Sequence, residues 1–430
     1  MKPSQSSIIT LSLALAAFTH SLRSDIVIPG ANGADGALNI TADTVIDLSK
    51  AVSGEWSDTL NAANAGKGIY DSNKWAVVFK YTEVTIASGA KVTFKNHPSR
   101  APLVWLVQGN VAINGDLSLD GEKFTEPPLL AEPGPGGFRG GTGRYSDGAT
   151  ESPGFGPGGG GAKAGNTWGE FGGGGSYGSV GFRGQPVYGN PSLIPLIGGS
   201  GGGGRNAGFG TPGLGGGAGG GAILIASGGT VSVNGMIHSN GGDGNYRRNM
   251  ENDFAGGSGG GIRIVCDTLA GTGVVQCLGG VSTIFGGLGR IRVERVSTSN
   301  SWIVTPDPSV VDIASGSSAI LWPPSGSPEV RIVSIGGADA PPDPRAAFGT
   351  LGADVAIPIT SSTAVIVETR NVEQASEVLV RGTPRMSGNY SETKATVASI
   401  VSTDPLVIRW TAALPVQAGY SAVQVRVIRP

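Results

Sequence analysis

The sequence predicts an all-β protein: a parallel β-solenoid with a glycine-rich inserted lobe, followed by a C-terminal antiparallel β-sandwich of immunoglobulin-like type. Three observations lead to this. A unit of three short strands recurs along the chain. Of the 430 residues, 75 are glycine, and about half of these fall between two of the repeats. After residue 300, short alternating strands are separated by turn residues. Few stretches place Ala, Leu, Glu and Lys at helical spacing, so almost no helix is expected.

The repeated unit is clearest at residues 102–121, 221–242 and 260–280. Each copy has an apolar strand, a second strand that ends at Asn-Gly or Thr-Gly, and a third that ends in glycine. Residues 75–94 form a looser copy, and 289–295 begin a last one. Repeats of this kind are typical of β-solenoids, in which equivalent strands stack in parallel. We therefore place a solenoid over residues 75–298, with these equivalent positions: Val111, Val231 and Leu269; Leu117, Ile237 and Val275; Gly121, Gly241 and Gly279.

Period-two alternation predicts which side chains face the solenoid core. Ile223, Ile225 and the equivalent isoleucines point inward, and Arg263 and Arg292 point outward. Cys266 and Cys277 fall on inward positions. A disulfide between them and two separate buried thiols are both compatible with the sequence. His238 falls on an outward position, where we expect it to face solvent.

The remaining chain divides into four parts. Residues 1–24 read as a secretory signal peptide, with Lys2 before an apolar run from Ile8 to Phe18. Residues 25–74 are expected to supply an N-terminal strand and a solenoid cap. Residues 299–328 read as a Pro/Ser linker, and 329–430 contain about seven short strands that predict the sandwich. The expected location is secreted or cell-surface, with no transmembrane segment.

The charge balance argues against one class of partner. The formal net charge is −2, and only 14% of residues are charged. Nucleic-acid binding requires a concentration of positive charge, which this chain lacks. No nucleic-acid partner is therefore expected.

The glycine-rich lobe spans residues 131–220 and contains nine aromatic residues. Flexible linkers seldom carry so many, so the prediction is an ordered lobe. Aromatic rings stack on the apolar faces of sugars, and arginines bind hydroxyl groups. This pattern predicts a glycan-binding surface, although the same aromatics would equally serve as a small core of the lobe. The candidate ligand-binding residues are Trp168, Phe171, Tyr177, Tyr188, Arg139, Arg144 and Arg183.

Residues 75–295 resemble right-handed parallel β-helix proteins, the pectin-lyase-like group, and glycine-rich secreted bacterial proteins of adhesin type. The resemblance lies in the repeated strand and glycine-turn pattern quoted above, without a diagnostic motif. It implies a right-handed winding. The group includes polysaccharide lyases, glycoside hydrolases and adhesins, so the resemblance leaves function open.

An enzymatic alternative rests on acids at one corner of the stacked turns. Asp120, Glu122 and Asp243, with Arg247 and Arg248, would form the site of a polysaccharide lyase or glycoside hydrolase. Asp and Asn are also favoured at bends for local hydrogen bonding alone. Asp243, Glu251 and Asp253 are spaced so that they could hold calcium loosely. No other cofactor is expected.

The sequence thus favours an exported, non-enzymatic protein that adheres to a surface or an extracellular matrix. The expected partner is a polysaccharide or a cell-surface glycan, with self-association as a further expectation.

Overall fold

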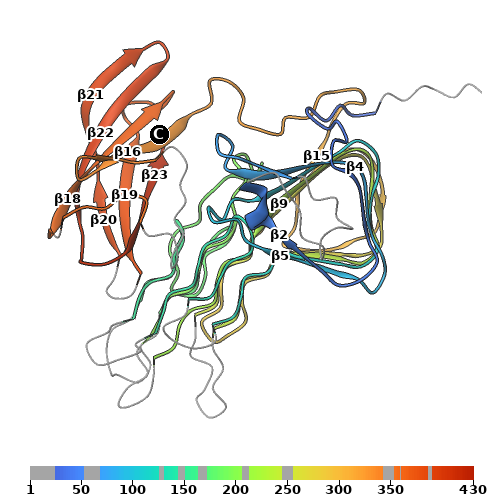
Figure 1. Ribbon diagram of the computed structural model, residues 1–430, viewed down its shortest axis with the longest axis horizontal. Helices are drawn as coiled ribbons and strands as arrows, with labels where there is room; N and C mark the ends of the chain where they lie inside the picture. Colours follow the sequence, from blue (N-terminus) through green and yellow to red (C-terminus); the bar gives the residue numbers. More distant parts are fainter. Residues whose placement is uncertain are drawn as a thin grey trace, which may run out of the picture.

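The computed structural model describes residues 25–52, 68–124, 130–143, 151–162, 172–205, 213–244, 255–341, 353–358, 360–385 and 390–430. Within these ranges the chain is all-β, as predicted, apart from a short 3-10 helix, η1 (Leu48–Val52). No helix among the described residues is long and apolar enough to cross a membrane. Parallel strands gather on one side of the molecule and the C-terminal strands on the other, with long extended segments between them (Figure 1). The predicted signal peptide lies outside the described residues.

The larger of two sheets in the first part of the chain, the long sheet, is mostly parallel. Its main path runs β1-β4-β6-β9-β11-β13-β15, while β7 pairs in parallel with β4 and β9, and β3 pairs antiparallel with β4. Neighbours along the main path follow one another in chain order, as repeated turns of one unit would require. The strands are β1 (Gly36–Ile40), β3 (Ile69–Asp71), β4 (Ala76–Ile86), β6 (Leu103–Val107), β7 (Val111–Ile113), β9 (Ala222–Val233), β11 (Gly261–Gly271), β13 (Arg290–Asn300) and β15 (Ser309–Asp312).

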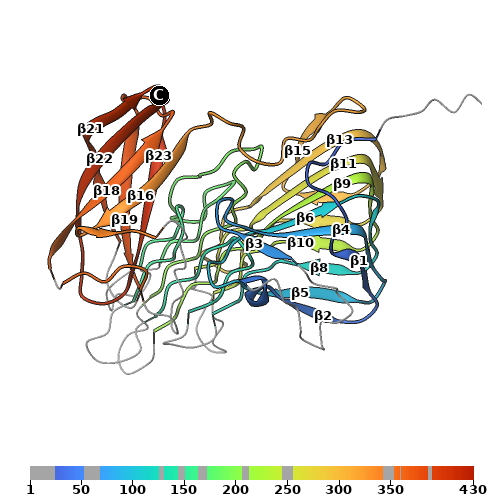
Figure 2. The same cartoon turned by 45° about the horizontal axis from the view of Figure 1, so that its top comes forward.

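The second sheet, the short sheet, is entirely parallel and pairs in the order β14-β12-β10-β8-β5-β2. Figure 2 shows β15 to β4 of the long sheet and β10 to β2 of the short sheet stacked in these orders. Apolar side chains from both sheets belong to one buried cluster, so the core lies between them. The strands are β2 (Thr44–Asp47), β5 (Lys91–Lys95), β8 (Asp116–Ser118), β10 (Met236–His238), β12 (Val274–Gln276) and β14 (Ile303–Thr305).

The predicted register of the repeats is confirmed. Val231 pairs with Val111 on one side and Leu269 on the other, and Ile237 pairs with Leu117 and Val275 in the same way. These side chains are buried in the shared core. A shift of one residue would turn every apolar side chain in a strand toward the opposite face, so the alternation fixes the register.

The parallel pairing continues beyond residue 298, into the segment that the sequence suggests is a linker. Strand β14 pairs with β12 in the short sheet, and β15 pairs with β13 in the long sheet. The chain then crosses the outer face of the long sheet. There Ala319 and Leu321 join Ile26 and Ile28 in a second apolar cluster over Val104 and its neighbours. Sequence alternation did not predict that this segment covers the long sheet, because the segment is not itself a regular strand.

The glycine-rich lobe is larger than 131–220. We use the name for the extended segments 119–124, 130–143, 151–162, 172–205, 213–221, 239–244, 255–260 and 277–289. Consecutive N–H groups in one segment donate to different neighbours. The N–H groups of residues 216 to 221 bond in turn to three segments, and the order repeats after three residues: Gly141, Ala255, Glu122, Phe138, Ser258 and Leu119. A three-residue period is that of the polyproline II helix, which has no internal hydrogen bonds.

Close approach between these segments requires glycine. A Cβ added to Gly201 would lie 2.0 Å from the carbonyl oxygen of Arg139, and one added to Gly216 would lie 2.0 Å from that of Gly202. Neither contact is sterically possible without moving backbone. The glycine runs are therefore hydrogen-bonded walls of the lobe, built from segments too close together to accommodate side chains.

The C-terminal unit, residues 329–430, contains two antiparallel sheets around one apolar core. The five-stranded sheet has β16 (Glu329–Ile335), β17 (Ala338–Asp339), β18 (Ser362–Arg370), β21 (Thr396–Thr403) and β22 (Leu406–Pro415). The three-stranded sheet has β19 (Glu377–Pro384), β20 (Ser391–Lys394) and β23 (Ser421–Ile428). Residues 353–359 alternate in sequence like one of the expected strands, but their described part, 353–358, forms none.

Candidate functional site

Two of the predicted ligand-binding aromatics are buried inside the lobe. Tyr177 and Tyr188 are 0% and 8% exposed and pack with Leu193. Their hydroxyl groups donate to the backbone carbonyls of Ile197 and Gly198 at 2.8 and 2.6 Å. Their prediction as ligand-binding residues is therefore corrected, because they form the small core that was the alternative.

The prediction that Arg139 binds ligand is also corrected, because an internal ion pair holds its guanidinium. It is 6% exposed, and its Nε donates to Glu132 Oε1 at 2.6 Å. Arg100 contacts the same carboxylate, with its Nη2 3.1 Å from Oε2. Burial raises the pKa of Glu132 despite the charge and the hydrogen bond of Arg100. Glu132 was not singled out from the sequence, since a lone glutamate in a glycine-rich stretch gives no pattern.

An aromatic pair is exposed at the surface of the lobe. Phe182 and Phe285 are 38% and 51% exposed, and their ring centroids lie 5.8 Å apart with the rings nearly edge to face. The guanidinium carbon of Arg183 lies 5.5 Å from the centre of the Phe182 ring. Val180 and Val281, near them in sequence, are exposed as well. We call these five residues the aromatic patch.

Backbone hydrogen bonds of the glycine segments hold the aromatic patch in place. The N–H of Phe182 donates to the carbonyl of Phe285 at 3.0 Å, and the N–H of Gly174 donates to the carbonyl of Phe182 at 2.9 Å. Arg183 has a positive φ of 52°, which turns the chain directly after Phe182. The rings thus extend from a backbone that is hydrogen-bonded on both sides. Ligand binding would therefore lose little backbone conformational entropy.

Arg183 is the described member of the predicted ligand-binding set that remains exposed. Trp168, Phe171 and Arg144 lie outside the described residues. Phe285 was missed because it belongs to a separate glycine-rich insertion, a hundred residues along the chain. Only the packing of the two insertions brings it to Phe182.

The described acids of the predicted catalytic corner are engaged by backbone N–H groups. Asp120 Oδ1 accepts a hydrogen bond from Asn240 N at 2.6 Å. Glu122 Oε2 accepts from Glu132 N at 3.1 Å, and Asp243 Oδ1 from Val281 N at 2.6 Å. Each carboxylate thus binds the backbone of another segment, not that of its own bend, so these acids tie neighbouring segments together. Arg247, Arg248, Glu251 and Asp253 lie outside the described residues.

His238 is buried between two carboxylates instead of facing solvent as predicted. Its Nε2 lies 2.5 Å from Asp116 Oδ1, and its Nδ1 lies 2.8 Å from Asp120 Oδ1. Burial disfavours the imidazolium, but the hydrogen bonds and charges of Asp120 and Asp116 outweigh it and raise the pKa of His238. The alternation correctly directed the side chain away from the core. It could not show that strand β8 and the following turn would enclose it.

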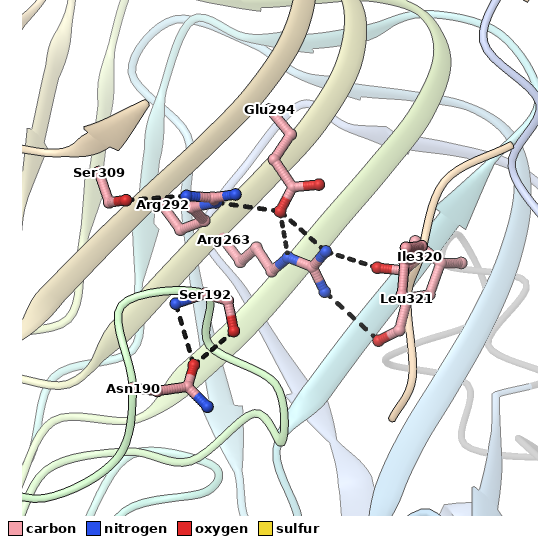
Figure 3. Close-up of polar contacts among 8 residues, drawn as sticks. All are labelled: Asn190, Ser192, Arg263, Arg292, Glu294, Ser309, Ile320 and Leu321. Carbon is pink, nitrogen blue, oxygen red and sulfur yellow. Dashed lines mark hydrogen bonds and ion pairs between the residues drawn. The ribbon is translucent and has the colours of Figure 1, made fainter. Parts of the chain in front are cut away.

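Arg263 points away from the core between the sheets, as predicted, but it is also buried. Its Nε and Nη2 donate to Glu294 Oε1 at 3.1 and 2.9 Å, and Nη2 donates to the carbonyl of Ile320 at 2.6 Å. Arg292 Nε donates to the same carboxylate oxygen at 3.1 Å (Figure 3). These contacts fasten the segment that crosses the outer face of the long sheet, which assigns Arg263 a structural role.

Cys266 and Cys277 are both free and both lie in the core between the sheets, so the disulfide alternative is excluded. Burial raises the pKa of Cys266 to about 12 and that of Cys277 well above its usual value. Thiols in this state are poor nucleophiles.

Within the described ranges, no three His, Cys, Asp or Glu side chains are grouped so that they could hold a metal ion. No protein-family model, curated protein or solved structure matches this chain.

Proposed function

We propose that this chain is an exported, non-enzymatic surface or matrix protein that binds glycans through the glycine-rich lobe. In this proposal the two parallel sheets are faces of a right-handed β-solenoid, and the C-terminal unit is an immunoglobulin-like β-sandwich. The solenoid carries the lobe, and the aromatic patch is the glycan contact.

The exposure of Phe182 and Phe285 carries the proposal. The lobe buries other aromatic rings, such as Tyr177, yet leaves these two at its surface with Arg183 beside them. Aromatic rings offer a flat apolar face for a sugar ring, and a neighbouring guanidinium donates to its hydroxyl groups. The hydrogen-bonded backbone beneath the rings is what a preformed binding surface requires.

A glycan array with the double variant Phe182→Ala/Phe285→Ala tests the proposal. Truncating a ring at the centre of a binding site typically costs about 2 kcal/mol, or roughly thirtyfold in Kd. The double variant should therefore lose the array signal that the unaltered protein gives.

Tyr420→Ala is the matched control, because Tyr420 is 50% exposed but belongs to the C-terminal unit. This variant should keep the array signal. Equal binding by the double variant and the unaltered protein would refute the role of the aromatic patch. Absence of any glycan signal from the unaltered protein would refute the proposed function.

A further inference from the structure

Val180 lies next to the segment that carries Phe285. A Cβ added to Gly287, two residues after Phe285, would lie 2.1 Å from the carbonyl oxygen of Ser179 and 3.1 Å from the N atom of Gly181. The two backbones therefore touch on both sides of Val180. Its side chain is 53% exposed, so it contributes an aliphatic group to the surface of the aromatic patch.

Val281 belongs to the same short loop as Phe285. The N–H of Gly286 donates to the carbonyl of Gly280 at 3.2 Å and closes this loop. Val281 follows the first of these glycines and Phe285 precedes the second, so they begin and end the loop. They are 77% and 51% exposed. The aromatic patch therefore combines its two rings with two branched aliphatic side chains.

Polar side chains are few at the aromatic patch. Arg183 is the polar member of its five residues. In the loop, Ser282 and Thr283 follow Val281, whose N–H donates to Asp243 Oδ1 at 2.6 Å. Few protein groups at the patch can therefore replace the water that a sugar hydroxyl loses on binding.

Such a surface discriminates between a methyl group and a hydroxymethyl group on a sugar. A hydroxyl group that is buried without a partner costs free energy, whereas a buried methyl group contributes favourably in proportion to its apolar area. A 6-deoxyhexose differs from its parent hexose in this one respect, because a methyl group replaces the hydroxymethyl group at C5. Its ring hydroxyls remain available to a hydrogen-bond donor such as a guanidinium.

We propose that the aromatic patch selects 6-deoxyhexose units of a glycan, an inference that rests on the proposed function of the patch. The sugar ring stacks on Phe285, because the guanidinium of Arg183 lies over the ring of Phe182, 5.5 Å from its centre. The methyl group packs against Val180 and Val281. Arg183 donates to a ring hydroxyl.

NMR titration of the full chain with two matched pairs of sugars tests the proposal. The pairs are D-fucose with D-galactose and L-rhamnose with L-mannose, and the members of each pair differ by one oxygen atom. The deoxy sugar of each pair should bind at least about fourfold more tightly, which corresponds to the burial of one methyl group. In saturation-transfer experiments its methyl protons should receive the strongest signal from the protein.

Val180→Thr/Val281→Thr replaces one methyl group by a hydroxyl on each valine and leaves both rings in place. The preference for the deoxy sugars should fall below about twofold, because the hydroxyls stay hydrated where the sugar methyl would pack. Val281→Thr alone should lower the preference as well, at a side chain too exposed to be needed for folding. Val330→Thr is the matched control, because Val330 is 39% exposed on β16 of the C-terminal unit, and it should leave the preference unchanged.

The outcomes separate this inference from the proposed function. Hexoses that bind as tightly as their deoxy partners, or a preference that survives both threonine variants, would overturn the selection of 6-deoxyhexoses. Array binding to glycans without such a sugar would then leave the proposed function standing. A glycan array without any signal would overturn the proposed function itself, and this inference with it.

Discussion

At the scale of single residues, burial decides the role of each polar and aromatic side chain. Tyr177, Arg139 and His238 are all outside the main apolar core, and each is nevertheless enclosed by a neighbouring segment. Sequence alternation predicted the direction of His238 but not its surroundings, because the carboxylate of Asp116 comes from a strand 122 residues earlier. Aromatic composition likewise could not separate Tyr177 from Phe182.

The histidine makes stability depend on pH. Because the folded protein raises the pKa of His238 above its ordinary value of 6.5, the imidazolium contributes stability below about pH 6.5. That contribution is lost as the pH rises through the folded-state pKa. A pKa difference of one between the folded and unfolded states is worth about 1.4 kcal/mol. Thermal unfolding of the unaltered protein should therefore lose stability relative to His238→Asn as the pH rises from about 6.5 through the folded-state pKa of His238.

Asp116→Asn serves as a second variant, because Asp116 Oδ1 lies 2.5 Å from His238 Nε2 and its charge helps to raise the pKa of the histidine. Removing this carboxylate should weaken the pH dependence without removing the histidine. A pH profile of His238→Asn that parallels that of the unaltered protein would contradict the assignment.

At the scale of elements, two backbone periods coexist in one chain. The strands alternate with period two, which made their register readable from residues such as Val231 and Ile237. The glycine segments have period three in their hydrogen bonds, and glycine carries no side chain to display that period in the sequence. The sequence could therefore predict an ordered lobe but not which segments would be neighbours.

Two glycine substitutions should show whether the segments of the lobe are closely packed. Gly201→Ala would place a methyl carbon 2.0 Å from the Arg139 carbonyl oxygen, whereas a Cβ on Gly161 meets nothing within 4 Å. The first variant should lose about 1–3 kcal/mol of stability, as overpacking does, and exchange amide hydrogens faster in the lobe. Gly161→Ala should leave both unchanged. Equal hydrogen exchange in the two variants would show that the lobe is not closely packed.

At the scale of the whole molecule, the C-terminal unit is held against the lobe. Arg381 bonds to Pro157, and the charge of Arg385, which follows strand β19, acts on the carboxylate of Glu132 in the lobe. Neither the Arg381 bond nor the effect of the Arg385 charge could be predicted from the sequence, since arginines in a short alternating strand are expected to face solvent. The unit was predicted from its strands, and its position was not.

Replacing the bridging arginine should release the C-terminal unit. Arg381→Ala removes the bond to Pro157 and leaves Glu392 without this cation. Small-angle X-ray scattering should then show a larger radius of gyration, and a protease should cleave faster between the two parts. Arg331→Gln breaks an exposed ion pair of the same unit and should change neither property. An unchanged scattering profile in Arg381→Ala would mean that other contacts hold the unit.

The sequence by itself determined the register of the repeated strands and the side chains that fill the core between the sheets. These follow from alternation and repetition, which are local properties of the chain. Tertiary structure alone decided that Tyr177 is buried, that Phe182 meets Phe285, and that Arg381 reaches Pro157. Each of those outcomes depends on segments far apart in the chain that pack through glycine backbones or irregular turns. Such segments carry no regular side-chain pattern from which their neighbours could be predicted.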